Sequence, residues 1–287
     1  MRLRGVGKRY SGGRPVLRGV DLDLVPGEVL AVTGGNGSGK STLLRIVVGA
    51  TRPSSGRVLD RPRQVGYVPE RFPSDERLTA RSYLAHMGRL RGLGTAEAVE
   101  RGSGLLDRLA LVGGADTPLR GLSKGNLQKV AVAQALVVPP ALLALDEPWS
   151  GLDHAAHGVL GEVIAEVAAE GGAVVFTDHR ESVVAITADR VCQVREGRAS
   201  VVDVDPADRV AVTRVVLRPP RLPGPPLADP LLHGVFDARD DGGGLVVVRV
   251  AGEHSDGFLL AALRQGWSVV RVDEAARAHR PEHGGLR

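Results

Sequence analysis

A glycine-rich stretch at residues 34–42, Gly-Gly-Asn-Gly-Ser-Gly-Lys-Ser-Thr, constrains this chain more than any other segment. It fits the pattern G-x-x-x-x-G-K-[ST] and stands between an apolar run at residues 29–32 and a helical apolar pattern at residues 43–48. This order indicates a phosphate-binding P-loop, in which backbone N–H groups and the positive end of a helix dipole face an anion. The residues expected to bind the phosphates are Gly34, Gly35, Asn36, Gly37, Ser38, Gly39, Lys40, Ser41 and Thr42.

Two side chains of this loop add chemistry to its backbone. Lys40 is expected to reach the β- and γ-phosphates of a nucleoside triphosphate, and Ser41 to hold Mg²⁺ through its hydroxyl. Glycines that merely turn the chain from strand to helix are the plainer alternative, but they need neither the lysine nor the hydroxyl. A dinucleotide-binding loop is excluded by spacing, because Lys40 occupies the place of the third glycine.

The composition is that of an ordinary globular protein. The 287 residues are 43% hydrophobic and 24% charged, which allows one large domain and a small one. No apolar run approaches the about 18 residues of a membrane-spanning helix, and residues 1–4 lack the apolar stretch of a secretory signal. The single cysteine, Cys192, leaves no internal disulfide and no cysteine-based zinc site. We therefore expect a cytoplasmic protein, or one attached to a membrane only through a partner.

The charge balance is basic but diffuse. A net charge of +4 permits an anionic partner such as nucleic acid or a membrane surface. The basic residues are scattered without a dense run, which favours a solvated arginine-rich surface. No direct nucleic-acid partner is expected.

Two carboxylates follow a fully apolar run at residues 141–145. A parallel strand that is buried on both faces has such a continuous apolar sequence, and ligands gather at the carboxyl ends of parallel strands. Asp146 is thus placed to hold Mg²⁺, and Glu147 to polarise an attacking water. A second apolar strand at residues 173–177 leads to His179, a candidate contact for the γ-phosphate.

The remaining motifs are weaker by themselves. Residues from about 73 to 138 are predicted to be mostly helical, and the segment 122–126, Leu-Ser-Lys-Gly-Asn, leads into the helical pattern of residues 130–136. That helix N-terminus either binds an anion or is simply capped. Residues 2–32 predict a short antiparallel sheet, where Tyr10 either stacks on a purine base or packs on its neighbours.

Taken together and in this order, the motifs resemble the ATP-binding subunit of an ABC transporter over roughly residues 1–200. By this resemblance, Tyr10 is the adenine-stacking aromatic, His179 the switch histidine, and Ser123 and Gly125 contact the nucleotide of a second subunit. The implied cofactors are ATP and Mg²⁺. The matching segments are the Walker A loop at residues 34–41, the signature at 122–126, the Walker B strand at 142–147 and the D-loop at 150–153.

Two positions depart from the family pattern. The loop at residues 65–70 usually ends in a glutamine that contacts Mg²⁺ and water, but here it ends in Glu70. Its carboxylate is a candidate Mg²⁺ ligand that adds negative charge beside the phosphates. Lys124 stands where the signature commonly has a glycine, in a form that resembles exporter-type subunits and hints at export.

The resemblance implies an α/β fold, with a P-loop NTPase core, an antiparallel β subdomain and a helical subdomain at about residues 73–138. The chain has one copy of each motif, so a complete site requires a two-fold dimer with a second ATP-binding subunit, most simply a homodimer. A separately encoded membrane-spanning permease would be the other partner, which places the subunit on the cytoplasmic face of the membrane. The alternatives are an ABC-type ATPase acting on nucleic acid or ribosomes, and a regulatory switch slowed by Glu70.

A small α+β appendage is expected at residues 201–287, beyond the family motifs. The simpler expectation is that the appendage packs on the chain or supports a dimer. The alternative is that it regulates the protein or docks a partner. Residues after about 275 are predicted to be disordered. The predicted elements are a strand at 209–217, a proline-rich loop at 219–230, a strand at 245–250, a helix at 255–265 capped by Ser255, and a strand at 267–272.

Overall fold

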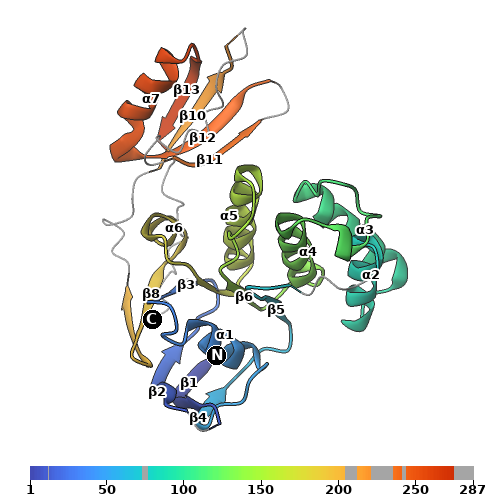
Figure 1. Ribbon diagram of the computed structural model, residues 1–287, viewed down its shortest axis with the longest axis vertical. Helices are drawn as coiled ribbons and strands as arrows, with labels where there is room; N and C mark the ends of the chain where they lie inside the picture. Colours follow the sequence, from blue (N-terminus) through green and yellow to red (C-terminus); the bar gives the residue numbers. More distant parts are fainter. Residues whose placement is uncertain (12, 73–76, 204–211, 221–234, 241–243, 275–287) are drawn as a thin grey trace, which may run out of the picture. The chain divides into compact units, whose positions relative to one another are not determined.

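The computed structural model describes residues 1–11, 13–72, 77–203, 212–220, 235–240 and 244–274 (Figure 1). The chain forms two compact units, Met1–Asp208 and Arg209–Arg287.

The first unit is built on a six-stranded sheet in the order β5-β6-β7-β3-β8-β9. The strands are parallel except for β9, which pairs antiparallel with β8. Strands β3, β6 and β7 are continuous apolar runs, as parallel strands covered on both faces must be. The strands are β3 (Val29–Thr33), β5 (Val65–Val68), β6 (Leu142–Asp146), β7 (Ala173–Thr177), β8 (Arg190–Arg195) and β9 (Arg198–Asp203).

The helices confirm the mostly helical region expected before residue 138, as far as the structure describes it. Among all the residues that the structure describes, no helix is long and apolar enough to cross a membrane. The short helix α6 was not predicted. The helices are α1 (Lys40–Val48), α2 (Ala80–Leu90), α3 (Thr95–Arg108), η1 (Leu119–Gly121), α4 (Lys124–Leu136), α5 (His154–Ala169) and α6 (Glu181–Thr187).

The two faces of the central sheet carry different layers. Side chains alternate between the faces along each strand. In β6, Leu143 and Leu145 join a core with α4 and α5, while Leu142 and Ala144 join a second core with α1 and the N-terminal strands. Figure 1 accordingly shows α1 on one side of the sheet and α4 and α5 on the other. The P-loop helix and the signature helix therefore cover opposite faces.

The expected antiparallel sheet is present beside α1 and has three strands in the order β2-β1-β4. Its third strand, β4, was not predicted because its residues are mostly exposed and do not alternate between apolar and polar types. The strands are β1 (Arg2–Arg9), β2 (Pro15–Asp23) and β4 (Ser55–Leu59).

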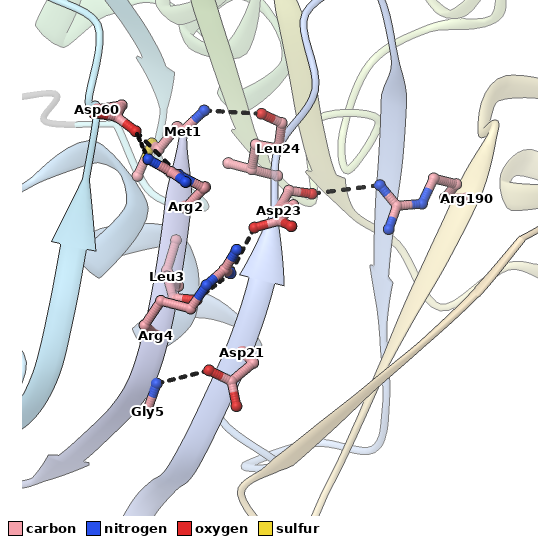
Figure 2. A network of polar contacts seen from close by, with 10 residues as sticks. All are labelled: Met1, Arg2, Leu3, Arg4, Gly5, Asp21, Asp23, Leu24, Asp60 and Arg190. Atoms are coloured by element: carbon pink, nitrogen blue, oxygen red, sulfur yellow. Dashed lines mark hydrogen bonds and ion pairs between the residues drawn. The ribbon is translucent and has the colours of Figure 1, made fainter.

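Exposed ion pairs cross this sheet (Figure 2). Arg2 Nη2 lies 2.7 Å from Asp60 Oδ2, and Arg4 Nη1 lies 2.6 Å from Asp23 Oδ1. The hydrogen bond from Arg4 lowers the pKa of the Asp23 carboxyl. Arg190 of β8 donates to the carbonyl of Asp23 at 3.4 Å. Because exposed pairs contribute only about 0–1 kcal/mol each, this network orients the sheet more than it stabilises it.

The second unit is an antiparallel sheet in the order β11-β12-β10-β13, with α7 packed on one face. Its core joins Val215, Leu217, Val248 and Val250 to Phe258 of α7. The elements are β10 (Val212–Arg218), β11 (Val235–Asp240), β12 (Val246–Ala251), η2 (Gly252–His254), α7 (Ser255–Arg264) and β13 (Ser268–Glu274).

The second unit differs from the sequence prediction in two places. Strand β11 was not predicted. Ser255 does not cap α7, because the cap position is His254 and the Ser255 hydroxyl instead donates to the Gly252 carbonyl at 2.7 Å. The turn of η2 places Ser255 inside the helix. Most of the predicted proline-rich loop, and all of the predicted disordered tail after residue 275, lie outside the described residues.

Candidate functional site

The loop between β3 and α1 requires glycine for steric reasons. Gly34 has φ +142°, and a Cβ there would lie 2.3 Å from the Val194 carbonyl oxygen. Gly39 has φ +112°, and its Cβ would lie 2.9 Å from Leu17 Cδ2. A pocket of about 890 Å³ borders the loop and is lined by residues 35–38 and by side chains of β2, β8 and β9. The backbone conformation of the loop thus follows directly from its glycines.

The side chain of Lys40 lies back over this loop. It is 8% exposed, and its ammonium donates to the carbonyls of Gly34 at 2.8 Å and Gly35 at 3.2 Å. An ammonium has three donors, so these two bonds leave one for a ligand. The structure therefore holds a positive charge where the backbone turns around the loop.

Four residues from three elements meet at the carboxyl edge of the sheet. Ser41 Oγ of α1 donates to Asp146 Oδ1 of β6 at 3.2 Å, and Thr177 Oγ1 of β7 donates to the same oxygen at 2.8 Å. Glu147 N donates to Thr177 Oγ1 at 2.8 Å. The pairing of β6 with β7, which sets Asp146 opposite Thr177, brings these groups together. Sequence analysis placed Ser41, Asp146 and Glu147 here but missed Thr177.

The Asp146 carboxylate has an unused oxygen. The residue is 1% exposed, and its Oδ2 has no hydrogen-bond partner among the described residues. A buried charged oxygen without a partner is costly, so the site suits a cation. Among the described residues, no group of three or more His, Cys, Asp or Glu side chains is arranged so that it could hold a metal ion. One carboxylate and the Ser41 hydroxyl still fit Mg²⁺, which is bound at such sites by one or two carboxylates together with substrate phosphates.

Glu147 has a backbone conformation that is uncommon for its residue type. Its φ is +48°, in the left-handed region, and its side chain is half-buried. Such conformations store strain and need support from their surroundings. The hydrogen bond from Glu147 N to Thr177 is part of that support. The left-handed conformation of Glu147 turns the chain just after Asp146.

Three other predicted site residues are Tyr10, His179 and Glu70. The structure describes no direct contact between them and the group formed by Ser41, Asp146, Glu147 and Thr177. The hydroxyl of Tyr10, which is 44% exposed, lies 3.5 Å from Thr42 Oγ1, and Lys8 Nζ lies 4.9 Å from the centre of its ring. His179 is exposed just after β7. Glu70 is also exposed and lines a pocket of about 400 Å³.

That smaller pocket contains a pair of residues that sequence analysis missed. Arg45 of α1 and Tyr67 of β5 line it together with Glu70. Burial raises the pKa of the Tyr67 hydroxyl, and the charge of Asp146 raises it further, against the opposing effect of Arg45. Tyr67 lies near enough to both Asp146 and Glu70 for the negative charge of each to raise its pKa.

The signature segment is not part of this centre. Ser123 is the N-cap of α4 and accepts from Asn126 N at 3.3 Å. The helix begins at Lys124, so Gly125 lies in its first turn; the prediction of a polar turn before a helix at residue 130 was wrong here. A Cβ on Gly125 would lie 2.4 Å from the Gly151 carbonyl oxygen. Lys124 and Gly125 thus contact the D-loop on the face of the sheet opposite α1, whereas the Asn126 side chain hydrogen-bonds with the backbone of Val112.

Fold and site together define a P-loop nucleoside triphosphatase. Comparison with known proteins narrows this class. The ABC transporter family model matches residues 17–150. The chain is 39% identical over 202 residues to the zinc import ATP-binding protein ZnuC of Halorhodospira halophila, covering 69% of this chain and 75% of the relative. It is 32% identical over 209 residues to the Nod factor export ATP-binding protein I of Cupriavidus metallidurans, covering 69% of each.

A solved structure agrees with these relatives. The dimeric structure of a post-hydrolysis state of an ATP-binding cassette, bound to ADP and Pi, superposes with a TM-score of 0.63 and 25% sequence identity. It covers 71% of this chain and 98% of the other. The chain belongs to the ABC transporter family. It is an ATP-binding ATPase subunit, and the predicted fold class is confirmed.

Proposed function

We propose that this chain hydrolyses ATP to power transport by a separate membrane-spanning permease. The observation that carries the proposal is the meeting of Ser41, Asp146 and Glu147 at the carboxyl edge of the sheet, with Thr177 joining the two carboxylate residues. Parallel sheets bind their ligands at this edge. A hydroxyl and two carboxylates placed next to a P-loop are suited to phosphoryl transfer to water.

Each residue then has one role. Lys40 and the backbone of residues 34–42 bind the β- and γ-phosphates, and Tyr10 stacks on the adenine. Ser41, Asp146 and Glu70 would hold Mg²⁺, which neutralises charge on the phosphate oxygens when bound. Glu147 orients the attacking water, and His179 contacts the γ-phosphate. Catalysis is mainly positioning and charge neutralisation.

A second copy of the chain completes the site. Ser123 and Gly125 begin a helix on the face of the sheet opposite α1, which supports their action on the nucleotide of a partner. A two-fold dimer gives two equal composite sites from one pair of surfaces. The dimeric cassette that superposes on this chain supports the same arrangement.

The permease is the other proposed partner, and it places the subunit on the cytoplasmic face of the membrane. The relatives include both an import and an export subunit, so their names set no direction. The signature lysine, Lys124, is the basis for proposing export. Transport by the reconstituted complex in sealed vesicles decides this point: ATP supplied on the side of this subunit should drive substrate away from that side.

Two measurements test the proposal. The tagged chain, purified from solubilised membranes, should bring an integral membrane protein with it, whereas nucleic acid in its place would contradict a transport role. By calorimetry, Lys40→Ala should weaken ATP binding because it removes the cation from the loop. Undiminished affinity in that variant would contradict the assignment of the P-loop.

A further inference from the structure

Helix α4 holds the segment that carries Glu147, residues 147–153, by contacts along one of its faces. Lys124 Nζ lies 3.3 Å from Ser150 Oγ. One turn further, Gln128 Nε2 donates to the Pro148 carbonyl at 3.1 Å. Together with the packing of Gly125 against Gly151, these contacts lie at the spacing of neighbours on a helix surface. The helix that begins at the signature is therefore joined to the 147–153 segment along much of that segment.

The contact at the end of the segment is an ion pair with one buried partner. Lys129 is 1% exposed, and its ammonium donates to Asp153 Oδ2 at 2.7 Å and to the Ala110 carbonyl at 2.9 Å. Burial opposes ionisation of Asp153, but the hydrogen bonds from Lys129 and from Ala156 N outweigh it, so the pKa of Asp153 lies below its ordinary value. Burying an ammonium is costly unless it is paired, and the Asp153 carboxylate supplies the pair.

The ion pair between Lys129 and Asp153 lies where it connects separate elements of the fold. Ala110 follows α3, so Lys129 connects the helical region to the end of the 147–153 segment. Asp153 also caps α5 by accepting from Ala156 N at 2.8 Å. At the start of the segment, Thr177 holds Glu147 N. The segment is thus fixed by a side-chain hydrogen bond at each end.

We propose that Lys129 is a positioning residue for Glu147. Its ammonium fixes Asp153, and with it the path of residues 147–153, so that Glu147 keeps its place after Asp146 at the carboxyl edge of the sheet. Lys129 acts only through this segment, because its ammonium bonds to Asp153 and to the Ala110 carbonyl. The inference rests on the proposed role of Glu147 in hydrolysis.

The test compares Lys129→Met with Lys129→Arg in the full-length protein. Methionine keeps most of the volume and removes the charge, whereas arginine keeps the charge and the donors. We expect Lys129→Met to lower the kcat of ATP hydrolysis about 10- to 100-fold, since small displacements of a reacting group cost this much. The Kd for ATP should change less than about twofold, because Lys129 does not contact the P-loop. Lys129→Arg should restore most of kcat.

Val130→Ala is the matched control. Val130 is the neighbouring residue of α4 and is fully buried, but its apolar side chain can form no hydrogen bond or ion pair with the 147–153 segment. We expect its Tm to fall while its kcat stays close to that of the wild type, with all proteins assayed well below the lowest Tm. An equal fall in kcat for Val130→Ala and Lys129→Met would overturn the proposal, and so would an unchanged kcat in Lys129→Met.

Two further variants keep the outcome decisive. If Lys129→Met does not fold, Asp153→Asn removes the charge of the other partner while retaining a residue that caps helices well. It should lower kcat in the same way, and wild-type turnover would overturn the inference. Glu147→Gln separates the two claims. If it abolishes turnover while Lys129→Met does not, only the positioning role fails; if it leaves turnover intact, the proposed function of Glu147 fails.

Discussion

The P-loop and the 147–153 segment both border the candidate site, but different forces hold them. The P-loop is fixed by backbone geometry, since Gly34 and Gly39 allow no side chain where the loop packs against Val194 and Leu17. The 147–153 segment is fixed by side chains: Thr177 at one end and Lys129 at the other. A loop whose shape depends on its glycines should move little when a distant side chain changes, whereas a segment held by side chains can follow the helix that holds it.

The largest effect is expected at the catalytic end of the side-chain-held segment. Glu147→Gln removes the carboxylate that we propose orients the attacking water, but it keeps the size of the side chain. We expect kcat to fall about 10²- to 10⁴-fold, as for the loss of a general base, with ATP binding retained. Steady-state hydrolysis and calorimetry measure the two quantities. Near-normal hydrolysis would remove Glu147 from this role.

The backbone-held loop should respond in the opposite way, by losing its nucleotide. In Gly34→Ala, the new Cβ would lie 2.3 Å from the Val194 carbonyl oxygen, in a conformation unfavourable for alanine. We expect a loss of about 2–4 kcal/mol in unfolding free energy and a weaker affinity for ATP. Denaturant unfolding and calorimetry check this. Wild-type affinity and stability would mean that glycine geometry does not fix the loop.

A smaller effect is expected for the free energy of unfolding of Lys129→Met, and it should depend on pH. Loss of the pair should cost about 1–3 kcal/mol at neutral pH, less than for a fully buried pair because the Asp153 side chain is 54% exposed. The pKa of Asp153 is lowered in the folded protein, so its contribution is present above the unfolded pKa of about 4 and is lost as the pH falls through the folded pKa.

The difference in stability between wild type and Lys129→Met should therefore shrink as the pH falls below about 4. Denaturant titrations at a series of pH values measure it. A difference that stays constant from neutral to acidic pH would show that Asp153 does not form the pair with Lys129 in solution.

The smallest effect is expected for an exposed pair outside both regions. Arg2 and Asp60 pair in Figure 2 with side chains that are 53% and 62% exposed. Arg2→Gln should cost less than about 1 kcal/mol in unfolding free energy and leave ATP hydrolysis unchanged. A large loss of activity would mean that the antiparallel sheet positions the site through side chains as well.

The same contrast explains what the sequence predicted. The P-loop, the Walker B strand and the strand before His179 follow from glycine spacing and continuous apolar runs, and the structure places them as expected. Strand β4 was missed because its mostly exposed residues have no apolar alternation. The ion pair of Lys129 was missed because a lysine in a helical pattern reads as a solvated residue, and only the meeting of α3, α4 and residue 153 buries it.

The start of α4 shows the limit in another form. The apolar pattern begins at Val130, but Ser123 caps the helix more than one turn earlier. The residues of that first turn contact other loops rather than the core: Lys124 and Gly125 contact the D-loop, and Asn126 hydrogen-bonds with the backbone of Val112. Periodicity detects burial, so it cannot detect a helical turn whose contacts are polar.

The central claim is that residues on opposite faces of the sheet act on one nucleotide across two chains. The most direct test is the mass in solution of two proteins, the Glu147→Gln variant and the Glu147→Gln/Ser123→Arg double variant. Each is measured with and without Mg²⁺ and ATP. We predict a dimer that forms only with ATP and is lost when Ser123 is replaced. A monomer that retains bound ATP, or a dimer that does not depend on Ser123, would contradict the account.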